Sequence, residues 1–177
     1  MSSKNKTQEV ISTFICSRDK DIEHFLKEKA IEFKKVSKSR TYFIVDEEAL
    51  ELGDFNILAY FSLAIQVLKV PIEISNRKTK HLDGLFSKRD GEKITEFPVF
   101  LIGQLAKNDT YAKLITGKEI LEYAISTIYK AHEKIGGRIV LVECADKKSL
   151  VDFYQSNEFE VIRQDEDKLI QLIRMIH

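Results

Sequence analysis

The order of structural elements is clearest in residues 101–159, which read LIGQLAKNDTYAKLITGKEILEYAISTIYKAHEKIGGRIVLVECADKKSLVDFYQSNEF. The apolar start of this stretch predicts a strand, and a polar turn follows it. From Gly117 onward, apolar residues recur at the spacings of three and four that indicate an amphipathic helix, which Gly136 and Gly137 end. An all-apolar run at 139–142 predicts a buried central strand, and a short helix is predicted over 149–155.

Strands and one more helix are predicted on both sides of this block. Residues 1–9 are polar and are expected to form a flexible tail, whereas VISTFIC at 10–16 predicts a strand. Asp19 and Asp21 precede apolar residues at helical spacing, so a helix is predicted over 22–33. The charged segment 71–96 reads as an excursion that is either a functional or a mobile loop. Further strands are predicted at 41–45, 57–68, 97–106, 159–162 and 169–176.

This order of elements predicts one α+β domain over residues 10–177, built on a mixed sheet. The chain has 177 residues, 44% of them hydrophobic, which is enough for one substantial core. Its 28 basic and 28 acidic residues cancel, which argues against a long-range attraction to nucleic acid or to anionic membranes.

The sequence also predicts a cytoplasmic location. The longest apolar run, 57–65, is too short to span a membrane, and the N-terminus lacks the pattern of a signal peptide. Cys16 and Cys144 lie in apolar runs and are typical of buried thiols in a reducing compartment.

The polar turn at 108–118, NDTYAKLITGK, has two interpretations. Backbone N–H groups at a helix N-terminus can bind a diphosphate, whose charge Lys113 and Lys118 would neutralise. The alternative is a plain strand-to-helix connection with two solvated lysines. Gly117 is the only glycine of the turn, and one glycine is weak support for a phosphate loop.

The block 101–159 resembles the core of the GNAT superfamily of acyl-CoA N-acyltransferases. That family has a strand, a loop of the form Gln/Arg-x-x-Gly-x-Gly/Ala, a long helix, and a strand followed by a second helix. When Gly117 is set on the last loop glycine, Ala112 stands where the family has Gln or Arg, and Ile115 replaces the first glycine. Lys118 matches the basic residue that often follows the loop.

The second family signature is a tyrosine on the later helix, followed by a Gly-Phe pair. Phe153-Tyr154 and Phe159 match it, with Glu158 in place of the glycine. Lys147 lies seven residues before Tyr154, where the family often has an asparagine. Upstream, SRTY at 39–42 and ILAY at 57–60 resemble the branch that includes toxins of bacterial toxin–antitoxin pairs.

This resemblance implies a mostly antiparallel, mixed central sheet that is splayed near its middle and has helices on both faces. It implies that acetyl-CoA pairs with the end of a strand and places its diphosphate at the loop. The implied binding residues are Leu105, Ala106, Lys107, Ala112, Lys113, Leu114, Ile115, Thr116, Gly117, Lys118 and Lys147. The phenol of Tyr154 would donate a proton to the departing CoA thiolate; without the family, Tyr154 reads equally as a core tyrosine.

No general base stands out among the ionisable residues. Glu96, Glu143 and Asp146 are the carboxylates expected nearest the cleft, and Glu143 reads either as a residue facing it or as a solvated strand end. The basic stretch 34–40 reads as a solvated helix end or as a tRNA contact. No metal is expected, because no metal-ligand spacing links the four histidines, His24, His81, His132 and His177.

Two hypotheses of different classes follow. The first is a GNAT N-acetyltransferase that transfers an acetyl group from acetyl-CoA to an amine on a small molecule, a protein or an aminoacyl-tRNA. The second is a non-catalytic CoA-binding or protein-interaction module, because Ala112 and Ile115 depart from the loop pattern. The expected partners are acetyl-CoA and an amine substrate, with a homodimer and tRNA as further candidates and no membrane.

Overall fold

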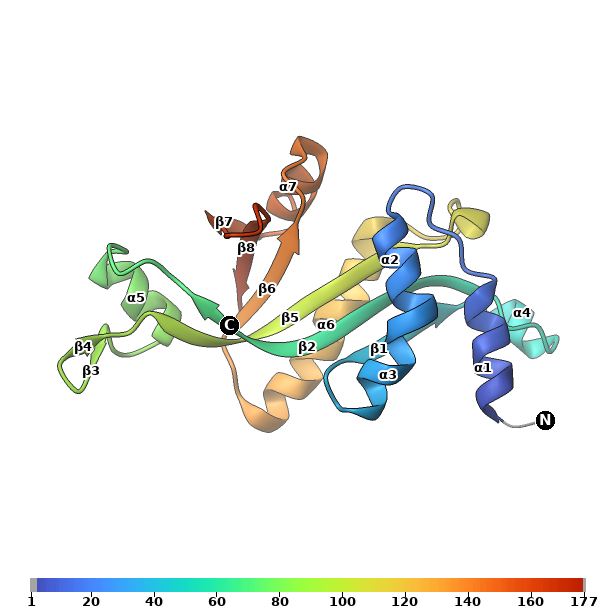
Figure 1. Ribbon diagram of the computed structural model, residues 1–177, viewed down its shortest axis with the longest axis horizontal. Coiled ribbons are helices and arrows are strands. Elements are labelled where there is room, and N and C mark those ends of the chain that lie inside the picture. Colours follow the sequence, from blue (N-terminus) through green and yellow to red (C-terminus); the bar gives the residue numbers. More distant parts are fainter. Residues whose placement is uncertain (1–2, 177) are drawn as a thin grey trace. The chain divides into compact units, whose positions relative to one another are not determined.

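A computed structural model describes residues 3–176 (Figure 1). The first of its two compact units comprises the described residues before 65 together with 103–126, and the second comprises 65–102 together with the described residues after 126. Strands β2 (Ile57–Lys69) and β5 (Glu96–Lys107) and helix α6 (Gly117–Ile135) contribute to both units. The prediction of a single domain over 10–177 stays a prediction.

One six-stranded sheet has the order β1-β2-β5-β6-β8-β7. The β1–β2, β6–β8 and β7–β8 pairs are antiparallel, and the β5–β6 pair is parallel. The prediction of an α+β fold with a mixed, mostly antiparallel sheet is therefore confirmed.

The first unit begins with a helix, α1 (Ser3–Ser12). The strand predicted at 10–16 is therefore wrong, and residues 3–9 of the expected flexible tail are helical; residues 1 and 2 lie outside the described residues. Ile11, on α1, and Phe14, two residues after its end, are 1% and 0% exposed, so this run packs into the core without forming a strand. The strand preference of a short apolar run is weak, and packing against neighbouring elements overrides it.

The helix predicted after Asp19 is confirmed, in three consecutive segments. These are α2 (Lys20–His24), the π-helical turn η1 (Phe25–Lys29) and α3 (Ala30–Lys35). Asp19 caps the start, because its side chain accepts hydrogen bonds from the amides of Asp21 and Ile22. Strand β1 (Arg40–Val45) follows as predicted, and the short helix α4 (Glu47–Glu51) between β1 and β2 was not predicted.

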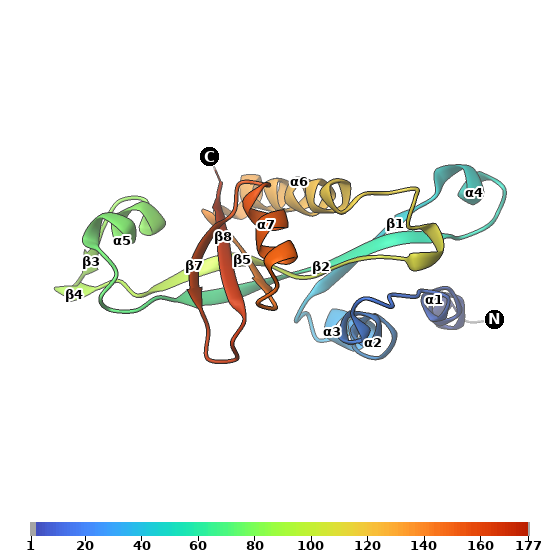
Figure 2. The same ribbon diagram turned by 90° about the horizontal axis from the view of Figure 1, so that it is seen from above.

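Helices cover both faces of the sheet in the first unit. Helices α1, α2 and α3 lie on one side of β1 and β2, and the first part of α6 lies on the other (Figure 2). Tyr60 of β2 donates its hydroxyl to the Ile22 carbonyl at 2.6 Å. The apolar cluster under α1–α3 consists of Ile11, Phe14, Cys16, Leu26, Ala30, Ile57, Tyr60 and Ala106.

Residues 71–96 are a folded part of the second unit. They contain α5 (Asn76–Asp83) and a hairpin of β3 (Lys88–Arg89) and β4 (Glu92–Lys93). Ser75 caps the start of α5, and Gly84 ends it in the left-handed region at a φ of 97°. Leu82 and Ile94 are buried in the apolar cluster of this unit.

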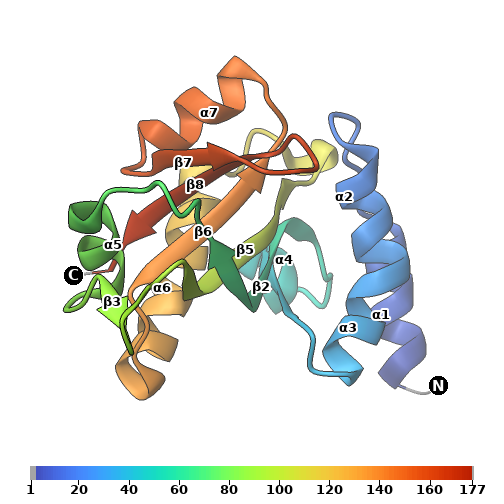
Figure 3. The ribbon, with the colours of Figure 1, turned by 60° about the vertical axis from the view of Figure 1, so that its left-hand side comes forward.

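Strand β6 (Ile139–Cys144) lies between β5 and β8, and its buried residues 139–142 confirm the predicted central strand. Its parallel register with β5 spans three pairs and ends at Ile102 and Val142, whereas β5 continues to Lys107. Helix α7 (Lys148–Gln155) then leads to β7 (Glu160–Gln164), which pairs with β8 (Ile170–Met175) (Figure 3).

Gly136 and Gly137 end α6 as predicted. Both have a positive φ, and the Gly136 amide donates to the His132 carbonyl at 2.8 Å. Gly137 is also needed for space, because a Cβ there would lie 2.5 Å from the Phe100 ring. Its carbonyl lies 2.8 Å from Nδ1 of His132, and since a carbonyl can only accept, Nδ1 carries the proton.

Candidate functional site

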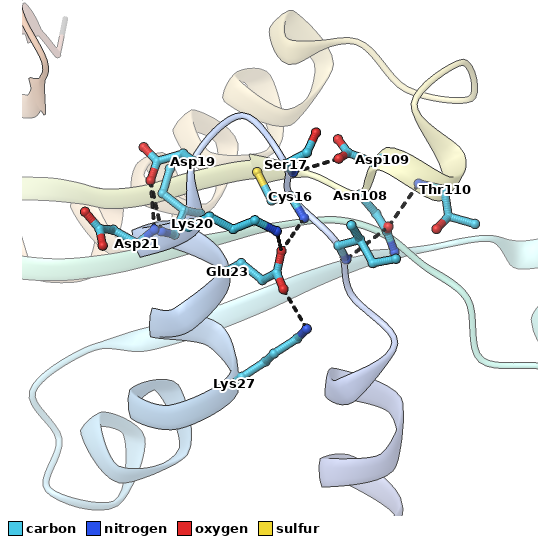
Figure 4. Close-up of polar contacts among 12 residues, drawn as sticks. Cys16, Ser17, Asp19, Lys20, Asp21, Glu23, Lys27, Asn108, Asp109 and Thr110 are labelled. Atoms are coloured by element: carbon cyan, nitrogen blue, oxygen red, sulfur yellow. Dashed lines mark hydrogen bonds and ion pairs between the residues drawn. The ribbon is translucent and has the colours of Figure 1, made fainter.

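Asn108, which the sequence analysis did not single out, fixes the end of β5. Its side chain is almost fully buried. Its Nδ2 donates to the Ile57 carbonyl at 2.9 Å, and its Oδ1 accepts from the Ile15 amide at 3.3 Å. The same Oδ1 accepts from the Thr110 amide at 3.2 Å (Figure 4). Asn108 thereby ties β2 and the α1–α2 loop to the start of the polar turn. The signal in the sequence was an Asn-Asp pair directly after an apolar strand, which is typical of a turn.

Asp109 holds the α1–α2 loop beside the same turn. The Ser17 amide donates to Asp109 Oδ2 at 2.7 Å (Figure 4). The Asp109 amide donates to the Ile15 carbonyl at 2.8 Å. Hydrogen bonds from Ser17 lower the pKa of Asp109. The carboxylate therefore keeps its charge and acts as a fixed acceptor for the loop.

Glu23 secures the other end of this loop. Its carboxylate accepts from the Cys16 amide at 2.8 Å and pairs with Lys20 and Lys27 at 3.0 and 2.8 Å (Figure 4). The hydrogen bond from Lys27, followed by those from Cys16 and Lys20, lowers the pKa of Glu23 to about 2. This network supports the beginning of α2 and is separate from the predicted binding residues.

The three predicted residues of β5 differ in their surroundings. Leu105 is half-buried, and Ala106 belongs to the apolar cluster under α1–α3. The Nζ of Lys107 donates a hydrogen bond to the Ala112 carbonyl at 3.0 Å, so its ammonium group joins the end of β5 to the polar turn. Gln104, beside them, has a buried Oε1 with no hydrogen-bond donor among the described residues.

Of the predicted loop residues 112–118, those before Gly117 form an irregular turn, and Gly117 and Lys118 begin α6. Lys113 is exposed, and Leu114 is 60% exposed, whereas Ile115 is buried at 6%. None of the residues 112–118 has a positive φ, so Ile115 occupies the position of the family glycine without backbone strain. Lys118 is exposed and lies 3.8 Å from Glu122, one turn along α6.

A capping box closes this loop onto the helix. The carboxylate of Glu119 accepts from the amide and the hydroxyl of Thr116, both at 2.7 Å, and the Glu119 amide donates to the Thr116 hydroxyl at 3.2 Å. Hydrogen bonds from the Thr116 hydroxyl and amide lower the pKa of Glu119. The Glu119 carboxylate, a negative charge of the protein itself, is therefore hydrogen-bonded to one amide of the loop. The sequence Thr-Gly-Lys-Glu carried the signal, since Thr followed three residues later by Glu is a capping pattern.

Other amides of the loop remain available. The amides of Ala112 and Leu114 donate to the carbonyls of Asp109 and Tyr111. Within residues 3–176, no acceptor is found for the amides of Lys113, Ile115, Gly117 and Lys118. These four N–H groups, at the positive end of a 19-residue helix, are the type of donor set that binds phosphate oxygens.

Tyr154 lies in the second unit, on the last turn of α7. It is half-buried, and its ring contacts those of Phe153 and Phe159 edge-on, with centroids 5.1 and 5.6 Å apart. Burial, with a smaller effect of nearby Cys144, raises the pKa of Tyr154 to about 12. The phenol therefore keeps its proton at neutral pH. In the described part of the chain, no residue accepts a hydrogen bond from its hydroxyl.

The turn after Tyr154 explains why the family has a glycine at the position of Glu158. Glu158 has a φ of 70°, in the left-handed region that favours glycine. This conformation turns the chain so that the Phe159 amide donates to the Tyr154 carbonyl at 3.1 Å. The Glu158 carboxylate pairs with Arg174 of β8 at 2.6 Å, which compensates part of the backbone strain.

Lys147, the other predicted residue of this unit, starts α7. Its side chain is exposed and makes no capping hydrogen bond. Its carbonyl accepts from the amides of Leu150 and Val151 at 2.9 and 3.1 Å. The backbone of Lys147 thus shapes the helix start, and its ammonium group is available to a ligand.

The three carboxylates predicted near the cleft have different environments. Glu96 pairs with exposed Lys69 at 3.1 Å, and Asp146 is exposed. Glu143 is half-buried, and its Oε1 accepts from Gln171 Nε2 at 2.7 Å and, over a long contact of 3.5 Å, from Gln66. It is therefore more than a solvated strand end.

Among the described residues, no group of three or more His, Cys, Asp or Glu side chains is placed to hold a metal ion. His177 lies outside these residues. A search of the described helices found none with the length and apolar character needed to cross a membrane.

Comparison with known proteins identifies the fold. No protein-family model and no curated protein matches the sequence. The structure of AtaT with acetyl-methionyl-tRNAfMet matches 91% of this chain and 85% of its own, at a TM-score of 0.69 and 16% identity. A tyrosine-to-phenylalanine variant of KacT matches 93% and 86%, at a TM-score of 0.70 and 18% identity. The chain has the GNAT fold.

A third GNAT-fold structure, AtaTR bound with acetyl-CoA, matches 92% of this chain and 84% of its own, at a TM-score of 0.68 and 18% identity. At these identities, the similarity establishes the arrangement of the elements and not the reaction. The reaction depends on the residues of the site, which differ between proteins that share a fold.

Proposed function

We propose that this protein is an N-acetyltransferase that transfers the acetyl group of acetyl-CoA directly to an amine. The observation that carries the proposal is the Tyr154 turn. A half-buried phenol with its proton retained stands at the end of α7, and the turn that holds it keeps the left-handed conformation even though Glu158 replaces glycine. Its support is the GNAT fold, shared with AtaTR bound with acetyl-CoA.

The residues of the first unit fit the chemistry of coenzyme A. The amides of Lys113, Ile115, Gly117 and Lys118 are donors for a diphosphate, with two ammonium groups to balance its charge. The Oε1 of Gln104, which has no hydrogen-bond donor within residues 3–176, is an acceptor for an amide N–H of the pantetheine arm. The backbone of 105–107 would extend this strand-like pairing. When bound, acetyl-CoA supplies an acetyl thioester.

Tyr154 is assigned a hydrogen bond to the leaving sulfur. With the Tyr154 pKa raised to about 12, complete transfer of its proton to a thiolate of pKa ~8.5 would be uphill by roughly 5 kcal/mol. The hydroxyl therefore stabilises the negative charge that develops as the C–S bond breaks, and need not become a phenolate. This sharpens the general-acid role that the family resemblance implies.

We infer that the acceptor class is the α-amine of an aminoacyl-tRNA. The support is the GNAT-fold structure of AtaT with acetyl-methionyl-tRNAfMet, which matches 91% of this chain. The balanced overall charge of this chain means that local basic residues would have to supply the RNA contacts.

One observation favours a second candidate, a non-catalytic module. Glu119 occupies the Thr116 amide with a negative charge, and this charge opposes a diphosphate at the same loop. A protein in which this contact is permanent would keep the fold and lose coenzyme A.

Calorimetric titration with acetyl-CoA, followed by assays of thiol release, separates these candidates. The acceptors are methionyl-tRNA and a panel of small primary amines, and Tyr154→Phe is measured beside the wild type. The proposal predicts binding, turnover and a roughly 10²- to 10³-fold lower kcat for Tyr154→Phe, with little change in acetyl-CoA affinity. Binding without turnover would support a CoA-binding module. No binding at millimolar ligand would exclude the acetyltransferase and support a module that has lost coenzyme A.

A further inference from the structure

A chain of polar side chains crosses the second unit at the point where the pairing of β5 and β6 ends. Glu143 is the first residue of β6 after the last parallel pair, Ile102–Val142. Its Oε1 accepts from Gln171 of β8 at 2.7 Å, and Gln171 Oε1 accepts from Arg163 Nε of β7 at 2.8 Å. Three neighbouring strands thus contribute one residue each.

The donor and acceptor of each hydrogen bond in this network are fixed by the chemistry of its two end groups. A guanidinium can only donate and a carboxylate can only accept, so the Gln171 amide has one permitted orientation, with its oxygen toward Arg163 and its nitrogen toward Glu143. Because both ends of the glutamine are engaged, Glu143 is held in one position. Its second oxygen, Oε2, accepts no hydrogen bond from any residue in 3–176.

The central residue of this network, Gln171, is a polar side chain buried among apolar residues. Gln171 is 4% exposed, and it is directly followed on β8 by the buried apolar residues Leu172 and Ile173. Burial of a polar amide is unfavourable unless it is fully hydrogen-bonded, and an apolar side chain would pack here without that requirement. Local departures from apolar packing of this type are expected at functional sites.

The two faces of β6 carry different groups at this point. Cys144, the next residue, is close enough to Tyr154 to affect the pKa of the phenol. Because successive side chains of a strand point to opposite faces, Glu143 lies on the other face. The end of β6 thus presents the Cys144 side chain on one face and the oriented carboxylate on the other.

We propose that Glu143 binds the attacking amine and accepts its proton, with Gln171 and Arg163 as positioning residues. This inference rests on the proposed function. In the reaction, the amine nitrogen bonds to the acetyl carbon, the C–S bond breaks, and its electron pair leaves with sulfur. The proton lost by nitrogen passes to Oε2 of Glu143 and then to solvent, and the thiolate takes a proton from solvent or through Tyr154.

Three variants test this assignment with methionyl-tRNA and the small-amine panel as acceptors. Glu143→Gln, which keeps the shape and the contact to Gln171, is expected to lower kcat/KM by roughly 10²-fold without changing acetyl-CoA affinity. Arg163→Leu is expected to lower kcat by roughly tenfold, and Arg163→Lys to restore part of it, because the lysine can still donate to Gln171. Glu133→Gln, which removes an exposed carboxylate of the same unit, is the matched control and is expected to change nothing.

The outcomes distinguish this inference from the proposed function. If the wild type turns over no acceptor, both are wrong. If the wild type is active and Glu143→Gln equals it in kcat and KM, the role of Glu143 is wrong and the acetyltransferase stands. If Glu143→Gln loses acetyl-CoA affinity by the same factor as it loses kcat/KM, the network only supports the fold. This result also overturns the inference.

Discussion

The left-handed turn at Glu158 leads to a prediction that tests the link between the family signature and the backbone. Glu158 has a φ of 70°, where a side chain costs roughly 1–2 kcal/mol relative to glycine. Its ion pair with Arg174 offsets only about 0.5 kcal/mol of this backbone strain, because the Glu158 side chain is 74% exposed and its charge is screened by solvent. Glu158→Gly and Glu158→Ala both remove the ion pair, so their difference reports the backbone alone.

We expect Glu158→Gly to be more stable than Glu158→Ala by roughly 1 kcal/mol, equivalent to a difference in Tm of about 2–4 °C for a chain of this size. The assay is urea unfolding followed by circular dichroism, with thermal unfolding as a second measurement. The control is the exposed residue Lys130 in the middle of α6, where glycine should be less stable than alanine by roughly 1 kcal/mol. If alanine equals or exceeds glycine at 158, the turn is not strained and the explanation of the family glycine is wrong.

Three further predictions follow from the first unit. Glu119→Gln should bind acetyl-CoA several-fold more tightly in calorimetry, because it removes the negative charge at the Thr116 amide; unchanged or weaker binding would contradict this. Asn108→Ala should lower the free energy of unfolding in urea by roughly 2–3 kcal/mol, because it leaves buried backbone groups without partners, and a loss below 0.5 kcal/mol would contradict a structural role. The pKa of Glu23 is lowered from 4.5 to about 2, so its contribution to stability is present above pH 4.5 and is lost as the pH falls toward 2. Glu23→Gln should therefore flatten the dependence of Tm on pH in this window, and an unchanged slope would show that other carboxylates dominate it.

The elements with strong periodicity were predictable from the sequence. The apolar residues of α6 recur at regular helical spacing, and Gly136 and Gly137 follow its last turn. The sequence therefore predicted this helix correctly. The all-apolar run of β6 likewise indicated a strand covered on both faces. By contrast, the run at 10–16 is too short for its period to be decided, and its β-branched residues favoured the wrong structure.

The candidate site was predictable only where one residue carries a family signature. The placement of Tyr154 on a short helix before a turn could be predicted, because local patterns define both elements, and its role stays a prediction. The contacts of Asn108 and Glu143 join residues 51 and 28 positions apart, and no local pattern reveals such pairs. The sequence also could not predict which loop amides lack an acceptor, because this depends on the carbonyls and side chains that folding brings near them.

The capping box at the start of α6 has a consequence for how the free and bound proteins differ. In the free protein, the Glu119 carboxylate occupies the Thr116 amide, which lies between the Ile115 and Gly117 amides that the proposed function offers to a phosphate, and a phosphate bound across this loop would displace this carboxylate. Glu119 is thus an internal surrogate for the ligand, and it keeps the first turn of α6 formed when no ligand is present. Association would then exchange one anion for another on a preformed loop, without the entropic cost of ordering it. In the reverse direction, the returning carboxylate would help to expel the product, so the same contact that weakens binding would shorten the time that coenzyme A stays after the reaction.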